Sequence, residues 1–264
     1  MNLLFCFEIF SLVEVKYLVA VGDASNNDKT EIIDISDSDM SCDLDYSISY
    51  TYGYSGGNFG GLLGSTPVIC NGNGQGCIII GTSQTITMNH YRSYAAAVAL
   101  NSTTLWVVGG SNSYDSTEFI SIDGGSVDGP NVPTKNNYLQ NHCMVKNPID
   151  GKVYILGGHG TDGTRSDVLV VKTSDSFSMA TGPQMNAARE QLGCAIMSIG
   201  SHIAIIAAGG ACPNNCDDYN SALDSVEILI TSTTNTWISG IFSQKMLYKY
   251  LGQIHLPLMG WTLC

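Results

Sequence analysis

The sequence predicts an all-β protein with a repeated, turn-rich architecture, and three observations support this prediction. Glycine accounts for 29 of the 264 residues, more than the usual share of about 7%. No window of helix length shows the apolar periodicity of an amphipathic helix. A strongly apolar segment that ends in Gly-Gly recurs at intervals of about 50 residues. The hydrophobic fraction of 44% suffices for a core and excludes a chain that is disordered throughout.

The repeated unit consists of a strand of small and apolar residues, a tight turn, an apolar strand that ends in Gly-Gly, and a later strand opened by Ser or Thr and an acid. Its three clearest copies have Gly-Gly pairs that start at Gly109, Gly157 and Gly209. Two weaker copies precede them, with YLVAVG ending at Gly22 and PVICNG ending at Gly72. Each copy has the composition of a four-stranded antiparallel sheet that must stack against neighbours to bury its faces.

A second motif keeps the same register. Met88 and Arg92 stand four residues apart before one copy, and Met185 and Arg189 stand four apart before another. Trp237 occupies a late strand in the last copy. The ordered set of Gly-Gly, Ser-x-Glu, late Trp and Met-x-x-x-Arg resembles the kelch repeat. The stretches GGLLGSTPVICNG, LWVVGG and GPNVP further resemble secreted invertebrate kelch proteins whose middle is similar to the central domain of galactose oxidase.

This resemblance implies a kelch-type β-propeller over residues 16–240. About five four-stranded blades are expected, at residues 16–58, 59–89, 90–137, 138–188 and 189–240. The tail, 241–264, resembles no blade, so it is expected to be an irregular closing element or an incomplete end of the ring. Second strands lie between neighbouring blades, so we expect burial of Val107, Val108, Ile155, Leu156, Ile205 and Ile206. Trp237 is expected in the outermost strand of its blade, packed against a neighbouring loop.

The N-terminal segment, 1–15, is apolar and has two interpretations. It is either a signal-like export segment or an edge strand, because Phe5, Phe7 and Ile9 alternate with Cys6 and Glu8. No window has the length and apolarity of a membrane span.

Two pairs of the nine cysteines are close in sequence. Cys70 and Cys77 bracket a Gly-rich turn, and Cys212 and Cys216 bracket Pro-Asn-Asn, so both pairs are candidates for local disulfides. Free buried thiols are the alternative, and a zinc site is disfavoured because no second Cys or His pair has the required spacing. Together with the glycosylation sequon at Asn101, the pairs favour an extracellular protein over a cytoplasmic one.

The charge narrows the class of partner. The formal net charge is −12, and only 11 residues are Lys or Arg, which argues against a nucleic-acid ligand. Acidic residues gather at 34–45, where a solvated loop is favoured over a calcium site because the Gly and late Glu of a calcium loop are missing.

No catalytic residue, metal ligand or cofactor site is predicted. His142 and His159 are expected near one end of the propeller axis, where a galactose-oxidase-like copper site would lie, but the two His, Tyr–Cys crosslink and axial Tyr of that site have no matching set here. The expected function is therefore binding of a protein or glycan through loops that follow the Gly-Gly strands, around Tyr114, His159 and Tyr219. The alternatives are a copper-radical oxidase or its remnant and a fragment of an intracellular kelch substrate adaptor.

Overall fold

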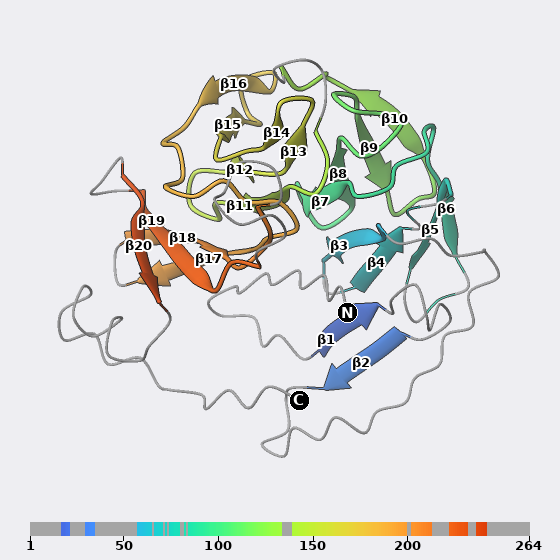
Figure 1. The fold of residues 1–264 in the computed structure, drawn as a ribbon. Helices are drawn as coiled ribbons and strands as arrows, with labels where there is room; N and C mark the ends of the chain where they lie inside the picture. Colours follow the sequence, from blue (N-terminus) through green and yellow to red (C-terminus); the bar gives the residue numbers. More distant parts are fainter. Residues whose placement is uncertain are drawn as a thin grey trace.

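The computed structural model describes residues 17–21, 30–34, 57–64, 66–70, 72, 74–79, 82, 84–133, 139–199, 202–212, 222–231 and 236–241. Within these ranges every regular element is a β-strand, and four four-stranded antiparallel sheets stand around a common axis (Figure 1). The predicted all-β propeller arrangement is confirmed. No described residue belongs to a helix, let alone one long and apolar enough to cross a membrane.

Each sheet forms one blade, which is named after its innermost strand. The β3 blade contains β3 (Phe59–Leu63), β4 (Thr66–Cys70), β5 (Gly76–Ile79) and β6 (Thr85–Thr87). The β7 blade contains β7 (Ala96–Ala99), β8 (Thr104–Val108), β9 (Thr117–Ser121) and β10 (Ser126–Gly129). The β11 blade contains β11 (Cys143–Lys146), β12 (Lys152–Leu156), β15 (Val168–Lys172) and β16 (Ser178–Thr181). The β17 blade contains β17 (Gly193–Ile199), β18 (His202–Ala208), β19 (Ser225–Ile230) and β20 (Ile238–Ile241).

Two hairpins accompany the blades. β13 (His159–Gly160) and β14 (Gly163–Thr164) form a short hairpin between the second and third strands of the β11 blade. β1 (Tyr17–Val21) and β2 (Thr30–Asp34) pair in a two-stranded sheet, and these are the only strands of the first predicted blade among the described residues. Residues 1–15, and the predicted tail apart from Ile241, lie outside the described residues.

The core lies between blades. Three clusters of buried apolar side chains fill the three interfaces between successive blades, because alternate residues of each second strand point to opposite neighbours. Val107, Val108, Ile155, Leu156 and Ile205 are each at most 2% exposed, as predicted.

The prediction for Ile206 is wrong, because this side chain is only half-buried. Ile203 and Ile205 on β18 face the β11 blade, so Ile206 faces the other way. No blade follows the β17 blade among the described residues, which leaves that face of β18 without a described blade against it.

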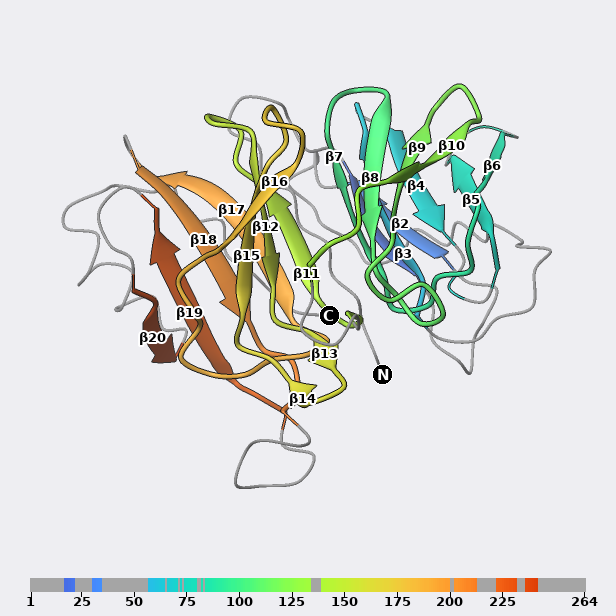
Figure 2. The same cartoon turned by 90° about the horizontal axis from the view of Figure 1, so that it is seen from above.

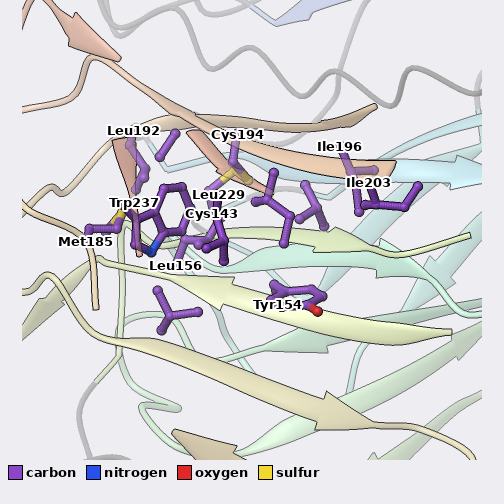
Figure 3. Packing of buried hydrophobic residues seen from close by; sticks show 14 residues of the cluster. Cys143, Tyr154, Leu156, Met185, Leu192, Cys194, Ile196, Ile203, Leu229 and Trp237 are labelled. Atoms are coloured by element: carbon purple, nitrogen blue, oxygen red, sulfur yellow. A yellow bond between two sulfur atoms is a disulfide. The ribbon is translucent and has the colours of Figure 1, made fainter. Parts of the chain in front are cut away.

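Trp237 packs in the cluster between the β11 and β17 blades (Figure 3). Its indole is 5% exposed, and its Nε1 donates a hydrogen bond of 2.8 Å to the carbonyl of Pro183 in the preceding loop. The predicted packing against a neighbouring loop is confirmed. The residue lies directly before the outermost strand, β20, rather than inside it.

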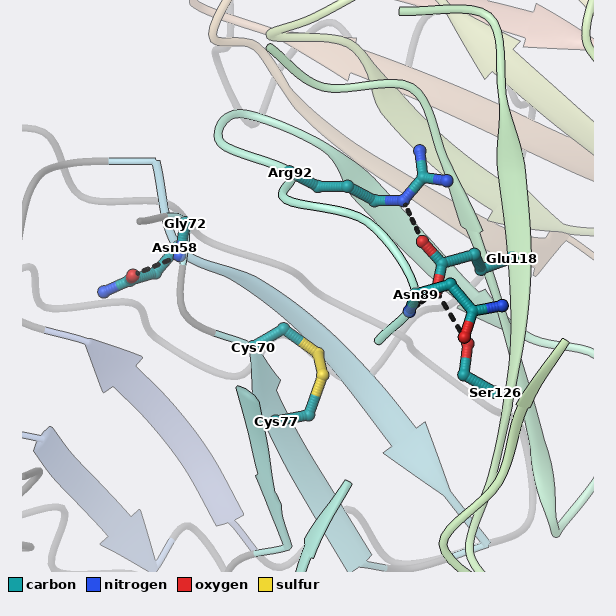
Figure 4. The surroundings of a disulfide bond; sticks show 8 residues. All are labelled: Asn58, Cys70, Gly72, Cys77, Asn89, Arg92, Glu118 and Ser126. Atoms are coloured by element: carbon teal, nitrogen blue, oxygen red, sulfur yellow. Dashed lines mark hydrogen bonds and ion pairs between the residues drawn. A yellow bond between two sulfur atoms is a disulfide. The ribbon is translucent and has the colours of Figure 1, made fainter. Parts of the chain in front are cut away.

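Two disulfides are described, and one of them was not predicted. Cys70 and Cys77 are bonded across β4 and β5, where they are direct partners, as predicted (Figure 4). Cys143 on β11 is bonded to Cys194 on β17, which joins the innermost strands of two blades. Cys212 is also disulfide-bonded, whereas Cys216, its predicted partner, lies outside the described residues.

The Met-x-x-x-Arg motif ends in a buried ion pair. Arg92 Nε donates to Glu118 on β9 at 2.7 Å, and both side chains are 0% exposed (Figure 4). Glu118 also accepts hydrogen bonds from the main-chain N–H groups of Asn89 and His90, so it holds the linker that arrives from the β3 blade. The other guanidinium nitrogens bond to Ser116 and to the carbonyl of Gly109.

The β17 blade repeats this unit. Arg189 bonds to Glu227 on β19 and to the carbonyl of Gly209, while Glu227 accepts from the main-chain N–H groups of Asn186 and Ala187. The motif therefore fastens the linker from one blade onto the third strand of the next.

Candidate functional site

The two ends of the propeller axis are built differently. Each innermost strand begins at one end of the axis, and in three of the blades the second strand returns to this end and finishes there in Gly-Gly. This end is termed the Gly-Gly end. The opposite end, where the innermost strand turns into the second strand, is termed the hairpin end. The β13–β14 hairpin follows Gly157-Gly158 and marks the Gly-Gly end, in front in Figure 1 and at the lower edge in Figure 2, whereas the β7–β8 turn lies at the upper edge in Figure 2.

A relay of main-chain hydrogen bonds joins successive blades at the Gly-Gly end. The N–H of Tyr94 donates to the carbonyl of Gly57, Asn141 donates to Tyr94, and Gln191 donates to Asn141, at 2.8–2.9 Å. The three donor residues hold φ values of 59°, 56° and 54°, which are uncommon for residues other than glycine. A strained conformation repeated in three blades needs a surrounding structure that enforces it, and such positions occur often at binding sites.

Polar side chains link neighbouring blades beside this relay. Ser111, which follows Gly109-Gly110, donates to the side-chain oxygen of Gln140 at 2.7 Å. One blade further on, Nδ1 of His159 lies 2.6 Å from a carboxylate oxygen of Glu190, and Thr164 donates to the same oxygen at 3.2 Å. Both links join the residue after a Gly-Gly pair to the residue before the next relay position. They form a polar, partly exposed rim.

Three partly exposed tyrosines lie at the Gly-Gly end of the β7 blade. Tyr91, Tyr94 and Tyr114 are 53%, 38% and 40% exposed. They lie on two segments that are fastened together, because Ser113 donates to the carbonyl of Tyr91 at 2.8 Å and Ser93 pairs with Ser111 in a β-bridge. The tyrosines thus stand on a fixed frame and offer aromatic surface with a polar hydroxyl, a combination that recurs at recognition sites.

His142 follows the relay residue Asn141 in the sequence, and it is 6% exposed. Neither ring nitrogen has a hydrogen-bond partner, and burial lowers the pKa of His142 to about 3. The ring is therefore neutral at physiological pH. The equivalent positions in the neighbouring blades hold Ala95 and Leu192, so His142 fills a place that is otherwise apolar.

The predicted loop residues have different outcomes. Tyr114 and His159 both lie at the Gly-Gly end, where His159 is 25% exposed and bonded to Glu190. Tyr219 lies outside the described residues. Asn101 is exposed at the hairpin end, in the turn between β7 and β8. In the described ranges, no three or more His, Cys, Asp or Glu side chains are grouped so as to hold a metal ion.

Sequence reasoning missed Tyr91, Tyr94, Gln140 and Glu190 as part of this end. A usable signal was present, because Tyr94 and Glu190 come one or two residues after the arginine of each Met-x-x-x-Arg motif. In the propeller those positions lie just before the innermost strands β7 and β17.

Comparisons with known proteins support the fold. No family model matches the chain, and no curated protein matches it. Among solved structures the chain is similar to that of YjhT, with a TM-score of 0.53 and 13% sequence identity. The match covers 71% of this chain and spans 65% of the YjhT chain, which is less than two thirds of that chain's length. At this identity the likeness shows the fold alone.

Proposed function

We propose that the protein is a non-catalytic binding module whose Gly-Gly end receives a protein or glycan partner. The observation that carries the proposal is the set of Tyr91, Tyr94 and Tyr114, which remain 38–53% exposed on segments that are themselves fastened by hydrogen bonds. Exposed aromatic side chains on a rigid frame lose little conformational entropy when a ligand covers them.

The polar rim complements the tyrosines. The Ser111–Gln140 and His159–Glu190 pairs continue from the tyrosine-bearing blade to the next two blades. A ligand that stacks on the tyrosines can therefore reach hydroxyl, amide and imidazole groups for directional hydrogen bonds. Small-ligand and protein sites commonly combine aromatic contact with a few such polar groups.

A kelch-type identity and an extracellular location are part of the same proposal. The repeated Arg92–Glu118 and Arg189–Glu227 units support the first, since both arise from one sequence motif in register. The Cys70–Cys77 and Cys143–Cys194 disulfides support the second, because such bonds persist in oxidising compartments.

The test is a binding screen with matched variants. The purified protein is applied to a glycan array and to cell surfaces, and the comparison uses the double variant Tyr91→Ala/Tyr114→Ala. The control is Val127→Ala/Ile149→Ala, which removes two exposed apolar side chains that are 64% and 72% exposed and belong to β10 and to the β11–β12 turn.

Loss of at least tenfold in affinity with the tyrosine variant alone supports the proposal. Equal binding by the two variants contradicts the site. Stoichiometric copper together with alcohol-dependent hydrogen peroxide production contradicts the non-catalytic assignment.

A further inference from the structure

We propose that Asn101 accepts an N-linked glycan in the exported protein, and that this modification marks the hairpin end as the end turned away from the partner. The orientation of the two ends rests on the proposed binding at the Gly-Gly end, whereas the modification lies at the hairpin end. Its acceptor sequence, Asn101-Ser102-Thr103, forms the turn between β7 and β8, and all three residues are exposed.

The turn holds the acceptor side chain in a defined state. The side-chain oxygen of Asn101 accepts hydrogen bonds from the main-chain N–H of Thr103 at 2.9 Å and from its hydroxyl at 3.0 Å. Neither bond uses the amide nitrogen, which is the atom that carries an N-linked glycan. The hairpin is closed behind it by a hydrogen bond from Leu100 N–H to the carbonyl of Thr104.

The neighbouring blade places a glycine beside the sequon. The neighbouring turn of the β3 blade reaches the sequon through Gly64, where an added Cβ would still lie 3.7 Å from the carbonyl oxygen of Ser102. Gly64 is itself exposed. At this point of approach the β3 blade therefore presents no side chain to the sequon.

A second observation comes from the disulfides. Cys70–Cys77 and Cys143–Cys194 join residues that are at most 8% exposed, so these bonds are part of the folded core. Disulfides of this kind form in the oxidising lumen of the secretory pathway, which is also the compartment where sequons are glycosylated.

The transfer is balanced with one co-reactant, an oligosaccharide carried on a lipid diphosphate. Nδ2 of Asn101 forms a bond to the anomeric carbon of the first sugar, and the bond from that carbon to the diphosphate oxygen breaks. The lipid diphosphate leaves with the electron pair, and the nitrogen gives up one proton. Nothing is oxidised or reduced.

The position has a consequence for the two ends of the propeller. Tyr94 lies before β7 at the Gly-Gly end, and Asn101 lies after β7 at the hairpin end, so a glycan on Asn101 lies at the other end of the blade from Tyr91 and Tyr114. A hydrated glycan at the hairpin end disfavours burial of that end in an interface and leaves the Gly-Gly end open.

The experiment translates the full chain behind a cleavable export signal in the presence of microsomes and analyses only the protease-protected product. We expect an electrophoretic shift that peptide N-glycosidase removes, and conversion of Asn101 to Asp in the released peptide. Asn101→Gln and Thr103→Ala should lose the shift, whereas Thr103→Ser should keep it.

The matched control is Asn112→Gln. Asn112 is also exposed, but Asn112-Ser113-Tyr114 has no Ser or Thr at its third position, so it is not a sequon and the shift should stay. A protease-protected chain whose Asn101 is unmodified overturns the inference and leaves the binding proposal standing. Loss of ligand binding with Asn101 occupied, restored by enzymatic removal of the glycan, overturns the orientation of the two ends.

Discussion

The β7 and β17 blades fasten their linkers with a buried Arg–Glu pair, whereas the β11 blade uses two leucines in the same places. Glu118 and Glu227 stand opposite Val107 and Ala207, and the equivalent partner of Ile155 is Leu169. The carbonyl of Leu139 accepts from Gly110 N–H as that of Arg189 does from Gly158 N–H, which places Leu139 at the arginine position. Both leucines belong to the apolar cluster between the β7 and β11 blades.

The same two positions are thus filled by a buried ion pair in the β7 and β17 blades and by two apolar side chains in the β11 blade. Burial lowers the pKa of Arg92, and the hydrogen bond and charge of Glu118 oppose that shift, so each charge depends on its partner. Two apolar residues of suitable size need no partner, and in other proteins they replace buried ion pairs without loss of stability. Leu169 has no carboxylate to accept hydrogen bonds from a linker, and the innermost strand of the β11 blade carries the disulfide to the β17 blade.

The largest effect is expected when only the carboxylate of the buried Arg92–Glu118 pair is removed. Glu118→Leu leaves the Arg92 guanidinium buried without its carboxylate, and it also removes the acceptor for two main-chain N–H groups. We expect a loss of about 3–5 kcal/mol in the free energy of unfolding, measured by urea denaturation. Asp123→Leu, which changes an exposed carboxyl group in the same blade, should stay within about 0.5 kcal/mol of the parent. Equal losses would show that the buried pair is not special.

The second effect concerns the disulfide that links the β11 blade to the β17 blade. Cys143→Ala/Cys194→Ala opens a link between residues 51 apart in sequence, and the loop-entropy relation gives a loss of about 4 kcal/mol. Cys70→Ala/Cys77→Ala opens a link of 7 residues and should cost about 2 kcal/mol. Thermal unfolding of both variants checks the order, and a larger loss from the shorter link would contradict it.

The third effect is a pH dependence of the free energy of unfolding, and it arises from His142 in the β11 blade. The pKa of His142 is lowered from 6.5 to about 3, so below pH 6.5 the unfolded chain binds a proton that the folded chain does not. The contribution of the neutral His142 ring to the free energy of unfolding is fully present above pH 6.5. It falls by about 1.4 kcal/mol per pH unit as the pH is lowered toward 3.

Urea denaturation of the parent and of His142→Leu, which copies Leu192, isolates this effect. The carboxyl groups are common to both proteins, so the difference between them should grow as the pH falls from 7 to 4.5. Parallel stability curves would mean that His142 is protonated in the folded protein.

The smallest effect is expected when both residues of the Arg92–Glu118 pair are replaced by leucine. Arg92→Leu/Glu118→Leu converts the β7 blade to the pattern of the β11 blade. The N–H groups of Asn89 and His90 and the hydroxyl of Ser126 then lack the carboxylate as acceptor, and the carbonyl of Gly109 loses the donor that Arg92 supplied. No buried charge is left unpaired, so we expect a loss of about 1–3 kcal/mol, less than that of Glu118→Leu alone. A double-mutant cycle measures the coupling. Additive losses would show that the arginine and the carboxylate act independently.

The sequence was most informative about features that a single repeat contains. Apolar strands, Gly-Gly ends and the Cys70–Cys77 pair depend on neighbours within one blade, so local pattern predicts them. The role of Met-x-x-x-Arg and the relay at Tyr94, Asn141 and Gln191 depend on contacts between blades, and no local propensity predicts a positive φ at tyrosine or glutamine.

The burial of Ile206 was overestimated for the same reason. Its apolar strand is like the others, but the degree of burial depends on the next blade, which the local pattern does not describe. Of the candidate site, the sequence named only Tyr114 and His159, because the loops after Gly-Gly are visible in sequence while their partners from the next blade are not.

The Cys143–Cys194 link also acts as a check on strand alignment. Cys143 pairs with Leu156 and Cys194 with Ala207, and these partners are one position apart in their repeats. Successive residues of a strand face opposite sides of a sheet, so this offset of one turns the two thiols toward each other. A slip of one residue in either strand would turn one thiol away from its partner. The two thiols can therefore form this disulfide only when both innermost strands are correctly aligned with their neighbours.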